Sequence, residues 1–165
     1  MEKHFKLRKD LTIEAYGITL FRIEATRDIE VRSVKKGDLG GYIEKEENLS
    51  ENAWVYGDAR VYGDAMVSGD AWVYGSAWVS GSACVSGDAW VKKTDDCRNI
   101  INDKYNITIL PESIQIGCQL HTKKEWWGFS DREIIEMDGK DGLKWWNKWK
   151  PIFMAICEEH QEVEK

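Results

Sequence analysis

Residues 53–91 repeat one six-residue unit, and the first three copies read AWVYGD, ARVYGD and AMVSGD (residues 53–70). The repeat ends on AWV (residues 89–91). Each unit opens with Ala, has Val two positions later, and closes on Gly followed by Asp or Ser. The alternation of Ala and Val with larger residues has the period of two that is typical of a strand. The Gly-Asp or Gly-Ser dipeptide that closes each unit favours a turn. Strands this short, with a corner every six residues, cannot form hairpins or helices, so the repeat predicts a solenoid.

The repeat resembles the hexapeptide-repeat family, whose left-handed parallel β-helix has three hexads in each triangular coil. The resemblance covers residues 49–91, with Leu49 in register one hexad upstream and Ile43 fitting more loosely. It implies that the alanines and valines of the hexads point inward, the valines being Val55, Val61, Val67, Val73, Val79, Val85 and Val91. The expected fold is mainly β, with a left-handed parallel β-helix of about two to three coils over residues 49–92.

An N-terminal β cap is expected over residues 1–48. Short strands are predicted at 4–8, 11–15 and 18–23, with a break at Lys9-Asp10. The segment through Gly40-Gly41-Tyr42-Ile43 resembles the N-terminal lead-in of small hexapeptide-repeat proteins of phages and prophages. Such a segment should cover the open first coil, whose unpaired strand edges would otherwise recruit other chains.

A small C-terminal α+β module is expected over residues 93–165. After a charged linker at 92–96, two β-rich segments flank Pro111 and predict a hairpin. Ser130 begins a capping box that predicts a helix ending near Gly139. A second helix is expected over about 142–159, kinked or split by Pro151. Adjacent tryptophans on a helix cannot share one core, so one of each pair should be exposed or contact another element; the pairs are Trp126-Trp127 and Trp145-Trp146.

Composition excludes several classes of function. A net charge of −6 argues against general affinity for nucleic-acid backbones. No run of 18 apolar residues exists and the N-terminus lacks a signal-peptide core, so no membrane partner is expected. The four cysteines, at 84, 97, 118 and 157, lack a close-spaced pair, which favours a reduced cytosolic state. With the resemblance, this predicts the cytoplasm of an infected or lysogenic bacterial host.

Three hexads per coil imply that residues 18 apart stack, which gives each face its own chemistry. The first face collects an aromatic set: Trp54, Trp72 and Trp90, with Tyr56 and Tyr74. The second face carries Arg60 and Trp78, with Tyr62 and Ser80. The third is small and weakly polar, with Met66 and Cys84 beside Ser68 and Ser86.

Five stacked aromatic side chains on the first face require a cover. Each Trp buries about 150–250 Å², so three approach the roughly 300–600 Å² of the largest apolar patch on a typical monomer. The cover is either a second subunit or the chain's own flanking segments, and a ligand platform is a third reading. Because hexapeptide-repeat subunits commonly trimerise through such faces, the resemblance favours a homo-oligomer, with the trimer as its usual form.

Catalytic and metal chemistry find little support. Acyltransferases of the resembled family use a His near the coils, whereas His4, His121 and His160 all lie outside the hexads. Cys118 and His121 are zinc-ligand types without a matching second pair, so a structural role is the simpler reading. Asp70 and Asp88 stack at one corner and are read as solvated turn residues. No metal and no cofactor are expected.

These observations predict a non-enzymatic binding protein. The resemblance to phage and prophage proteins leads us to expect an inhibitor of a host anti-phage defence system, acting on a host defence protein or by sequestering a signalling nucleotide. For a nucleotide, Arg60, Tyr62 and Trp78 offer a cation beside aromatic rings, which suits phosphate and base together. Two alternatives stay open: a hexapeptide-repeat acyltransferase depending on His121, and a purely structural, self-assembling scaffold.

Overall fold

Seven two-residue strands carry the hexads in the computed structural model, which describes residues 3–101 and 104–162. They are β4 (Trp54–Val55), β5 (Arg60–Val61), β6 (Met66–Val67), β7 (Trp72–Val73), β8 (Trp78–Val79), β9 (Cys84–Val85) and β10 (Trp90–Val91). Each pairs in parallel with the strand three hexads along, as in β4 with β7, β5 with β8, and β6 with β9. The predicted stacking of residues 18 apart is therefore confirmed.

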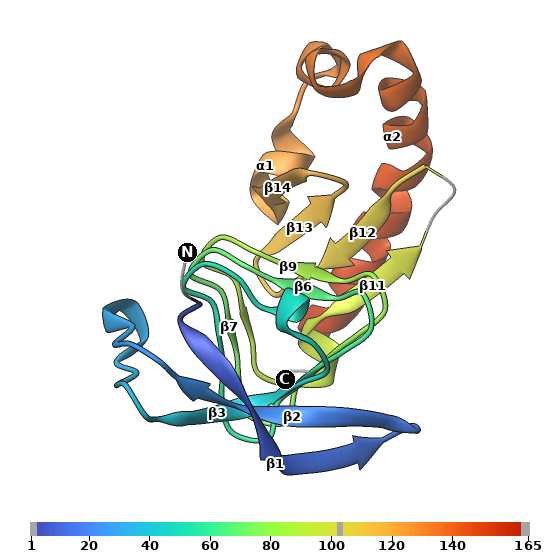
Figure 1. Ribbon diagram of the computed structural model, residues 1–165. Coiled ribbons are helices and arrows are strands. Elements are labelled where there is room, and N and C mark those ends of the chain that lie inside the picture. The colour runs from blue at the N-terminus through green and yellow to red at the C-terminus, as the bar shows by residue number, and fades with distance from the viewer. Residues whose placement is uncertain (1–2, 102–103, 163–165) are drawn as a thin grey trace. The chain divides into compact units, whose positions relative to one another are not determined.

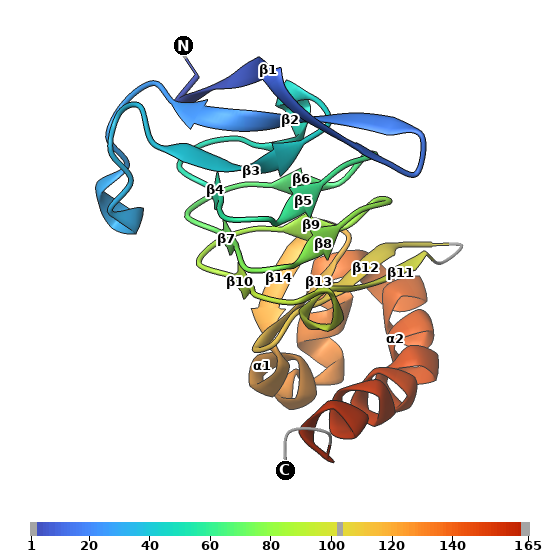
Figure 2. The same cartoon turned by 90° about the horizontal axis from the view of Figure 1, so that it is seen from below.

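The strands form three stacks, consistent with a small solenoid (Figure 2). The predicted left-handed sense stays a prediction. The chain as a whole is mixed α/β, not mainly β as expected, because a long helical segment follows the strands.

The interior of the hexads is lined by Val and Ala, as predicted. All seven valines are fully buried, as are the five alanines from Ala53 to Ala77 that open the first five hexads. Turn glycines hold the corners at positive φ, which side-chain-bearing residues rarely adopt. At Gly69, φ is +69°, and a Cβ would lie only 2.9 Å from the backbone nitrogen of Gly87 in the next coil. Glycine is therefore required there by both conformation and space.

Three N-terminal strands extend one stack of the hexads. Strands β1 (Phe5–Ala15) and β2 (Ile18–Ala25) form a hairpin, and β3 (Leu39–Ile43) runs parallel to β5. The resulting sheet has the order β1-β2-β3-β5-β8 (Figure 2), and its first three strands are also labelled in Figure 1. The predicted break at Lys9-Asp10 is only a register irregularity inside β1. Two 3-10 turns, Glu30–Arg32 and Glu46–Asn48, lie on either side of β3.

A four-stranded antiparallel sheet follows the last hexad. A 3-10 turn, Thr94–Asp96, leads to β11 (Arg98–Ile101), β12 (Asn106–Ile109), β13 (Ser113–Ile116) and β14 (Gln119–Thr122). The predicted hairpin is confirmed as β12–β13, whereas β11 and β14 were not expected.

This sheet belongs with the hexads, and not with the helices. The chain divides into two compact units, residues 1–122 and 123–165, so the division falls well after the boundary expected near residue 93. The physical reason is apolar packing: Leu110 is buried in the same core cluster as the hexad valines, and Leu120 packs against it.

The second unit is helical. Helix α1 spans Lys123–Gly128, and α2 spans Asp131–Glu162 with non-helical backbone angles at Asp138 and Gly139. This interruption matches the predicted end of the first helix near Gly139, and Pro151 does not split the second. The Ser130 capping box is confirmed, because its backbone N–H donates to Glu133 Oε2 at 2.8 Å. Within the described residues, no helix is both long and apolar enough to span a membrane.

The expectation for the tail tryptophans is met in this unit. Trp126 and Trp146 are buried, while Trp127 and Trp145 are half-buried. Trp126 and Trp146 lie with ring centroids 5.1 Å apart, and Phe153 is fully buried beside Trp146.

Candidate binding surfaces

The first face carries the predicted tryptophan column, which we define as Trp54, Trp72 and Trp90 with Tyr56 and Tyr74. Parallel pairing sets the three indoles in register on β4, β7 and β10. Their exposure is not uniform, contrary to expectation: Trp54 is 0% exposed, Trp72 is half-buried and Trp90 is 42% exposed. The exposed aromatic surface is therefore smaller than predicted and includes Tyr56, which is 53% exposed.

The chain's own N-terminal segment covers the first two indoles. The ring of His4 lies 6.3 Å from that of Trp54, and His4 Nε2 is 2.9 Å from the Ala53 carbonyl oxygen. Burial lowers the pKa of His4, which favours the neutral form of its imidazole ring against Trp54. The Arg32 guanidinium lies 5.6 Å from the Trp72 ring. Of the two covers left open by the sequence, flanking residues provide the one seen over Trp54.

The second face carries a row of alternating cations and rings, the Arg–aromatic row, made of Arg22, Tyr42, Arg60 and Trp78. Register places these residues side by side on β2, β3, β5 and β8. The Arg22 guanidinium lies 5.2 Å from the Tyr42 ring, and that of Arg60 lies 4.7 Å from the Trp78 ring. Arg22 also donates to the Tyr42 hydroxyl at 3.1 Å. Both guanidinium groups are thus held by aromatic surfaces.

Among the described residues, no carboxylate neutralises the charge of Arg22 or Arg60. Within the part of the chain that the structure describes, neither has a carboxylate oxygen within 4.0 Å. The neighbouring Arg8 differs, since it pairs with Asp10 and, at 2.7 Å, with Glu24. Arg60 Nε is buried and has no hydrogen-bond partner among the described residues. The row therefore holds two positive charges available to an anion.

Two further tyrosines border this row. Tyr16, at the tip of the β1–β2 hairpin, is 75% exposed. Its ring centroid lies 5.3 Å from that of Trp78 and 6.5 Å from that of Tyr62. The predicted set of Arg60, Tyr62 and Trp78 is therefore brought together on one surface.

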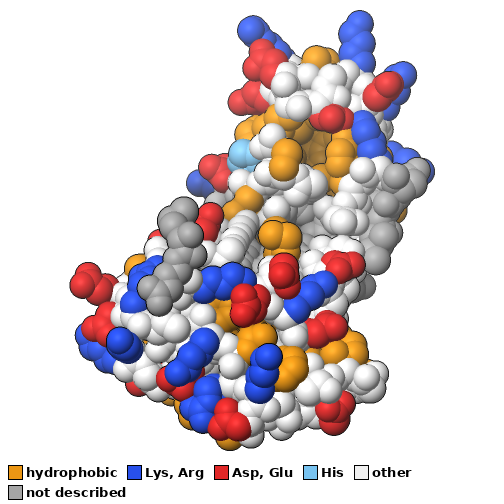
Figure 3. All heavy atoms as spheres, viewed as in Figure 1, with side chains coloured by type: hydrophobic (Ala, Val, Ile, Leu, Met, Phe, Trp, Pro, Cys, Tyr) orange, Lys and Arg blue, Asp and Glu red, His pale blue; other side chains and the backbone are white. Residues whose placement is uncertain are grey.

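Sequence reasoning missed three residues of this surface. Tyr42 lies 18 positions before Arg60, so the repeat period itself could have found it. Arg22 and Tyr16 had no such signal, because they come from an antiparallel hairpin whose register the hexads do not set. Around the N-terminal strands, Lys, Arg, Asp and Glu side chains are intermixed on the visible face and form no field of one sign (Figure 3).

The remaining candidates for chemistry, Cys118, His121, Asp70 and Asp88, form no metal site among the described residues. Cys118 is exposed, and His121 Nε2 lies 3.3 Å from Gln119 Oε1. Across residues 3–101 and 104–162, no group of three His, Cys, Asp or Glu side chains is placed to hold a metal ion. Asp70 accepts a hydrogen bond from Asn52 Nδ2 at 3.1 Å, as a turn residue would. The side chain of His160 lies outside the described residues.

One family model matches the chain. It is described as the YdcK beta solenoid repeat and matches the overlapping stretches 53–69, 59–75 and 65–81. The match identifies a beta-solenoid repeat, hexapeptide-like in period, within the hexads. No curated protein is similar enough to match the chain. The predicted link to phages stays a prediction.

Proposed function

We propose that this chain is a non-enzymatic binding protein that holds a nucleotide on the Arg–aromatic row. The observation that carries the proposal is the pair of guanidinium groups, Arg22 and Arg60, which lie against aromatic rings and have no carboxylate partner among the residues that the structure describes. A guanidinium fork suits the paired oxygens of a phosphate group, and an aromatic ring suits a base.

The geometry favours a mononucleotide over a long polynucleotide. The sheet ends at β8, so Trp78 is the last ring of the row, and Arg60 lies against one side of it. A base stacked on such a ring contributes roughly 1–3 kcal/mol. A polynucleotide would have to track a surface where Glu24 and other carboxylates are interspersed, on a protein of net charge −6.

The test is calorimetric titration with ADP, with inorganic phosphate as the minimal probe. We expect Arg60→Ala to weaken ADP binding by about ten- to a hundredfold, because a hydrogen bond to a charged group contributes roughly 1.5–3 kcal/mol. Arg132→Ala is the matched control, since Arg132 is exposed and paired with Glu136 in the helical unit. Equal ADP affinity in the wild type and Arg60→Ala would remove the site.

A second substitution separates base from phosphate. Trp78→Leu should weaken ADP binding while leaving phosphate binding unchanged, because the Arg60 charge remains. If Trp78→Leu weakened ADP binding and phosphate binding to the same extent, the Trp78 ring would only position Arg60 and would not bind the base.

We also propose that the exposed residues of the tryptophan column join two or more copies of the chain. Trp90 and Tyr56 remain exposed on that face after the N-terminal segment has covered Trp54. Light scattering after size exclusion should give an oligomer for the wild type and a smaller species for Trp90→Asp; a trimer would agree with the hexapeptide-repeat resemblance. A monomeric wild type at high micromolar concentration would contradict this.

The proposed partner is a signalling nucleotide or a protein of a bacterial defence system, in the cytoplasm of a phage-infected host. That part rests only on the resemblance of the N-terminal segment to phage proteins. Capture of nucleotides from host extract on the immobilised chain, with Arg60→Ala as the blank, would support the nucleotide form. If the immobilised wild type and the immobilised Arg60→Ala variant retained the same nucleotides from the extract, the nucleotide form of the proposal would be contradicted.

A further inference from the structure

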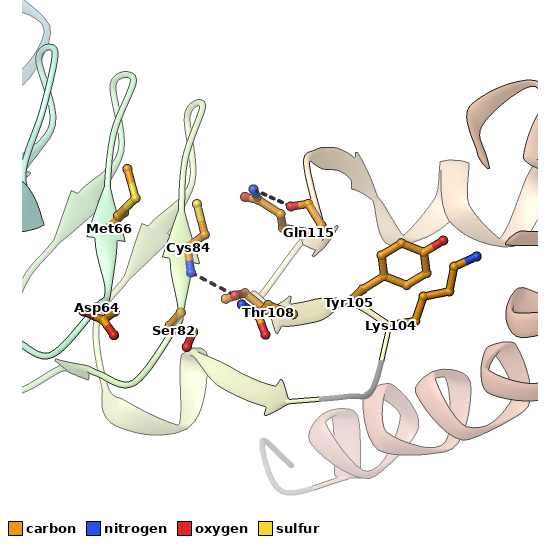
Figure 4. A pocket seen from close by; sticks show the side chains of 11 residues that line it. Asp64, Met66, Ser82, Cys84, Lys104, Tyr105, Thr108 and Gln115 are labelled. Carbon is orange, nitrogen blue, oxygen red and sulfur yellow. Dashed lines mark hydrogen bonds between the residues drawn. The ribbon is translucent and has the colours of Figure 1, made fainter.

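A cavity of about 450 Å³ lies on the third face of the hexads, away from the Arg–aromatic row. One wall is formed by Met66 and Cys84, which are in register on β6 and β9. Thr108 of β12 and Gln115 of β13 line the other side (Figure 4). The volume lies within the roughly 300–1,000 Å³ of small-molecule sites. Both Thr108, 2% exposed, and Gln115, 9% exposed, are buried polar side chains held in place by strands.

The hydrogen bonds of these two residues use one acceptor lone pair on each side chain and leave each side chain a donor proton. Thr108 Oγ1 accepts from the Cys84 backbone N–H at 2.9 Å, and its own hydroxyl proton has no acceptor among the residues described. Gln115 Oε1 accepts from Ser86 Oγ at 2.9 Å, so its acceptor is engaged. Gln115 Nε2 donates to the Gly117 carbonyl at 3.2 Å, and the Gln115 amide also hydrogen-bonds the Cys84 sulfur, which is only a weak acceptor.

The sulfur wall is apolar and uncharged. Burial raises the pKa of the Cys84 thiol, so it is protonated at neutral pH and adds no negative charge. Met66 is 50% exposed and stacks in register with Cys84, which gives a polarisable surface suited to an apolar group. Asp64 at the rim is paired with Lys45 at 3.1 Å and lies mostly in solvent.

We propose that this cavity binds a small organic acid. Its carboxylate would accept hydrogen bonds from the Thr108 hydroxyl and the Gln115 amide, and its apolar body would lie against Met66 and Cys84. The polarity of the site favours an acceptor group on the ligand: Thr108 and Gln115 each present a donor proton, while one of the two lone pairs on each of their oxygens already accepts a hydrogen bond. This site is independent of the proposed nucleotide site on the second face.

The test is a fluorine NMR titration with two probes of similar size, 4-fluorobenzoate and 4-fluorobenzyl alcohol. A fragment of about ten heavy atoms should bind with a dissociation constant on the order of 1 mM. We expect the acid to bind at least fivefold more tightly than the alcohol. Cys84→Leu, which fills the cavity, should weaken the binding of 4-fluorobenzoate by tenfold or more. Arg60→Ala, on the second face, should leave the affinity for 4-fluorobenzoate unchanged. Conversely, Cys84→Leu should leave the affinity for ADP unchanged.

A second variant keeps the proposal testable if Cys84→Leu fails to fold, as judged by thermal unfolding. Thr108→Val removes the hydroxyl proton but keeps the shape, so it should bring the acid-to-alcohol preference close to one. Three results would overturn the proposal: no saturable binding of the acid up to about 10 mM, equal binding of both probes to the wild type, or an unchanged preference in Thr108→Val.

Discussion

The N-terminal strands approach the hexads closely at Gly41, and a methyl group there should separate them. A Cβ on Gly41 would lie 2.6 Å from the Ala59 carbonyl oxygen and 2.6 Å from Val55 Cγ1. Ordinary contacts begin near 3.4 Å, so the Gly41→Ala protein must move β3 away from β5 by several tenths of an ångström. That movement strains the hydrogen bond from the Tyr42 N–H to the Ala59 carbonyl, now 2.9 Å.

The expected loss follows from three terms. Forcing a methyl group into a well-packed core costs roughly 1–3 kcal/mol. Weakening one strand-to-strand hydrogen bond costs about 0.5–1.5 kcal/mol. Replacing Gly by Ala also restricts the unfolded chain and returns about 0.4–1 kcal/mol. The free energy of unfolding should therefore fall by about 0.5–4 kcal/mol, with about 2 kcal/mol at the centre of the range.

Urea denaturation followed by tryptophan fluorescence measures this change. Gly128→Ala is the matched control, because it lies in helix α1 and a Cβ there would have nothing within 4 Å. The control should be unchanged or slightly more stable. A Gly41→Ala protein as stable as the wild type, within about 0.5 kcal/mol, would refute the claim that contact between β3 and β5 at this glycine holds the N-terminal strands in place.

Two other consequences concern the ends of the hexads. The lowered pKa of His4 means that the folded state binds fewer protons than the unfolded state. The contribution of His4 to the free energy of unfolding is therefore complete above the ordinary histidine pKa near 6.5. It is lost as the pH falls from that value through the lower pKa of the folded state. The urea midpoint should drop less between pH 7.5 and 5 in His4→Gln than in the wild type; equal drops would contradict the role of His4. At the other end, Asp96 Oδ2 accepts from the backbone N–H groups of Lys92 (2.9 Å) and Lys93 (3.0 Å). Asp96→Ala should lower the free energy of unfolding by about 1–3 kcal/mol in urea, whereas Asp88→Ala, at an exposed turn, should change it little.

The hexad core could be predicted because every hexad contains its own strand and its own turn. Val and Ala positions follow from the local period, and a fixed number of hexads per coil then sets every strand pair. Exposure could not be predicted in the same way. Trp54, Trp72 and Trp90 share the same Ala-Trp-Val context, yet their exposure rises from fully buried to 42%. The difference comes from distant residues such as His4, whose position depends on tertiary packing.

The candidate sites divide in the same manner. The repeat places Arg60 beside Trp78, which the sequence predicted. The lack of a carboxylate partner for Arg22 among the described residues could not be read from the sequence, since Arg8, opposite Arg22 on β1, pairs with two carboxylates. Residues 92–96 looked like a solvated linker, but Asp96 is 9% exposed and caps two backbone donors. Composition indicates charge, whereas tertiary contacts decide whether a charged side chain is solvated, paired or available.

The way the hexads end also explains why a cavity lies beside the last coil. Each coil donates backbone hydrogen bonds to the next, as when the Met66 N–H binds the Ala83 carbonyl at 2.9 Å. The last coil has no successor, so its donors need acceptors from elsewhere. Thr108 supplies one by accepting from the Cys84 N–H, which draws β12 against the third face. Because a hydroxyl that accepts still carries a proton, the group that ends the ladder leaves a buried donor facing the adjoining space. The same requirement that stops the repeat from recruiting further strands thus builds the polar side of the proposed acid site.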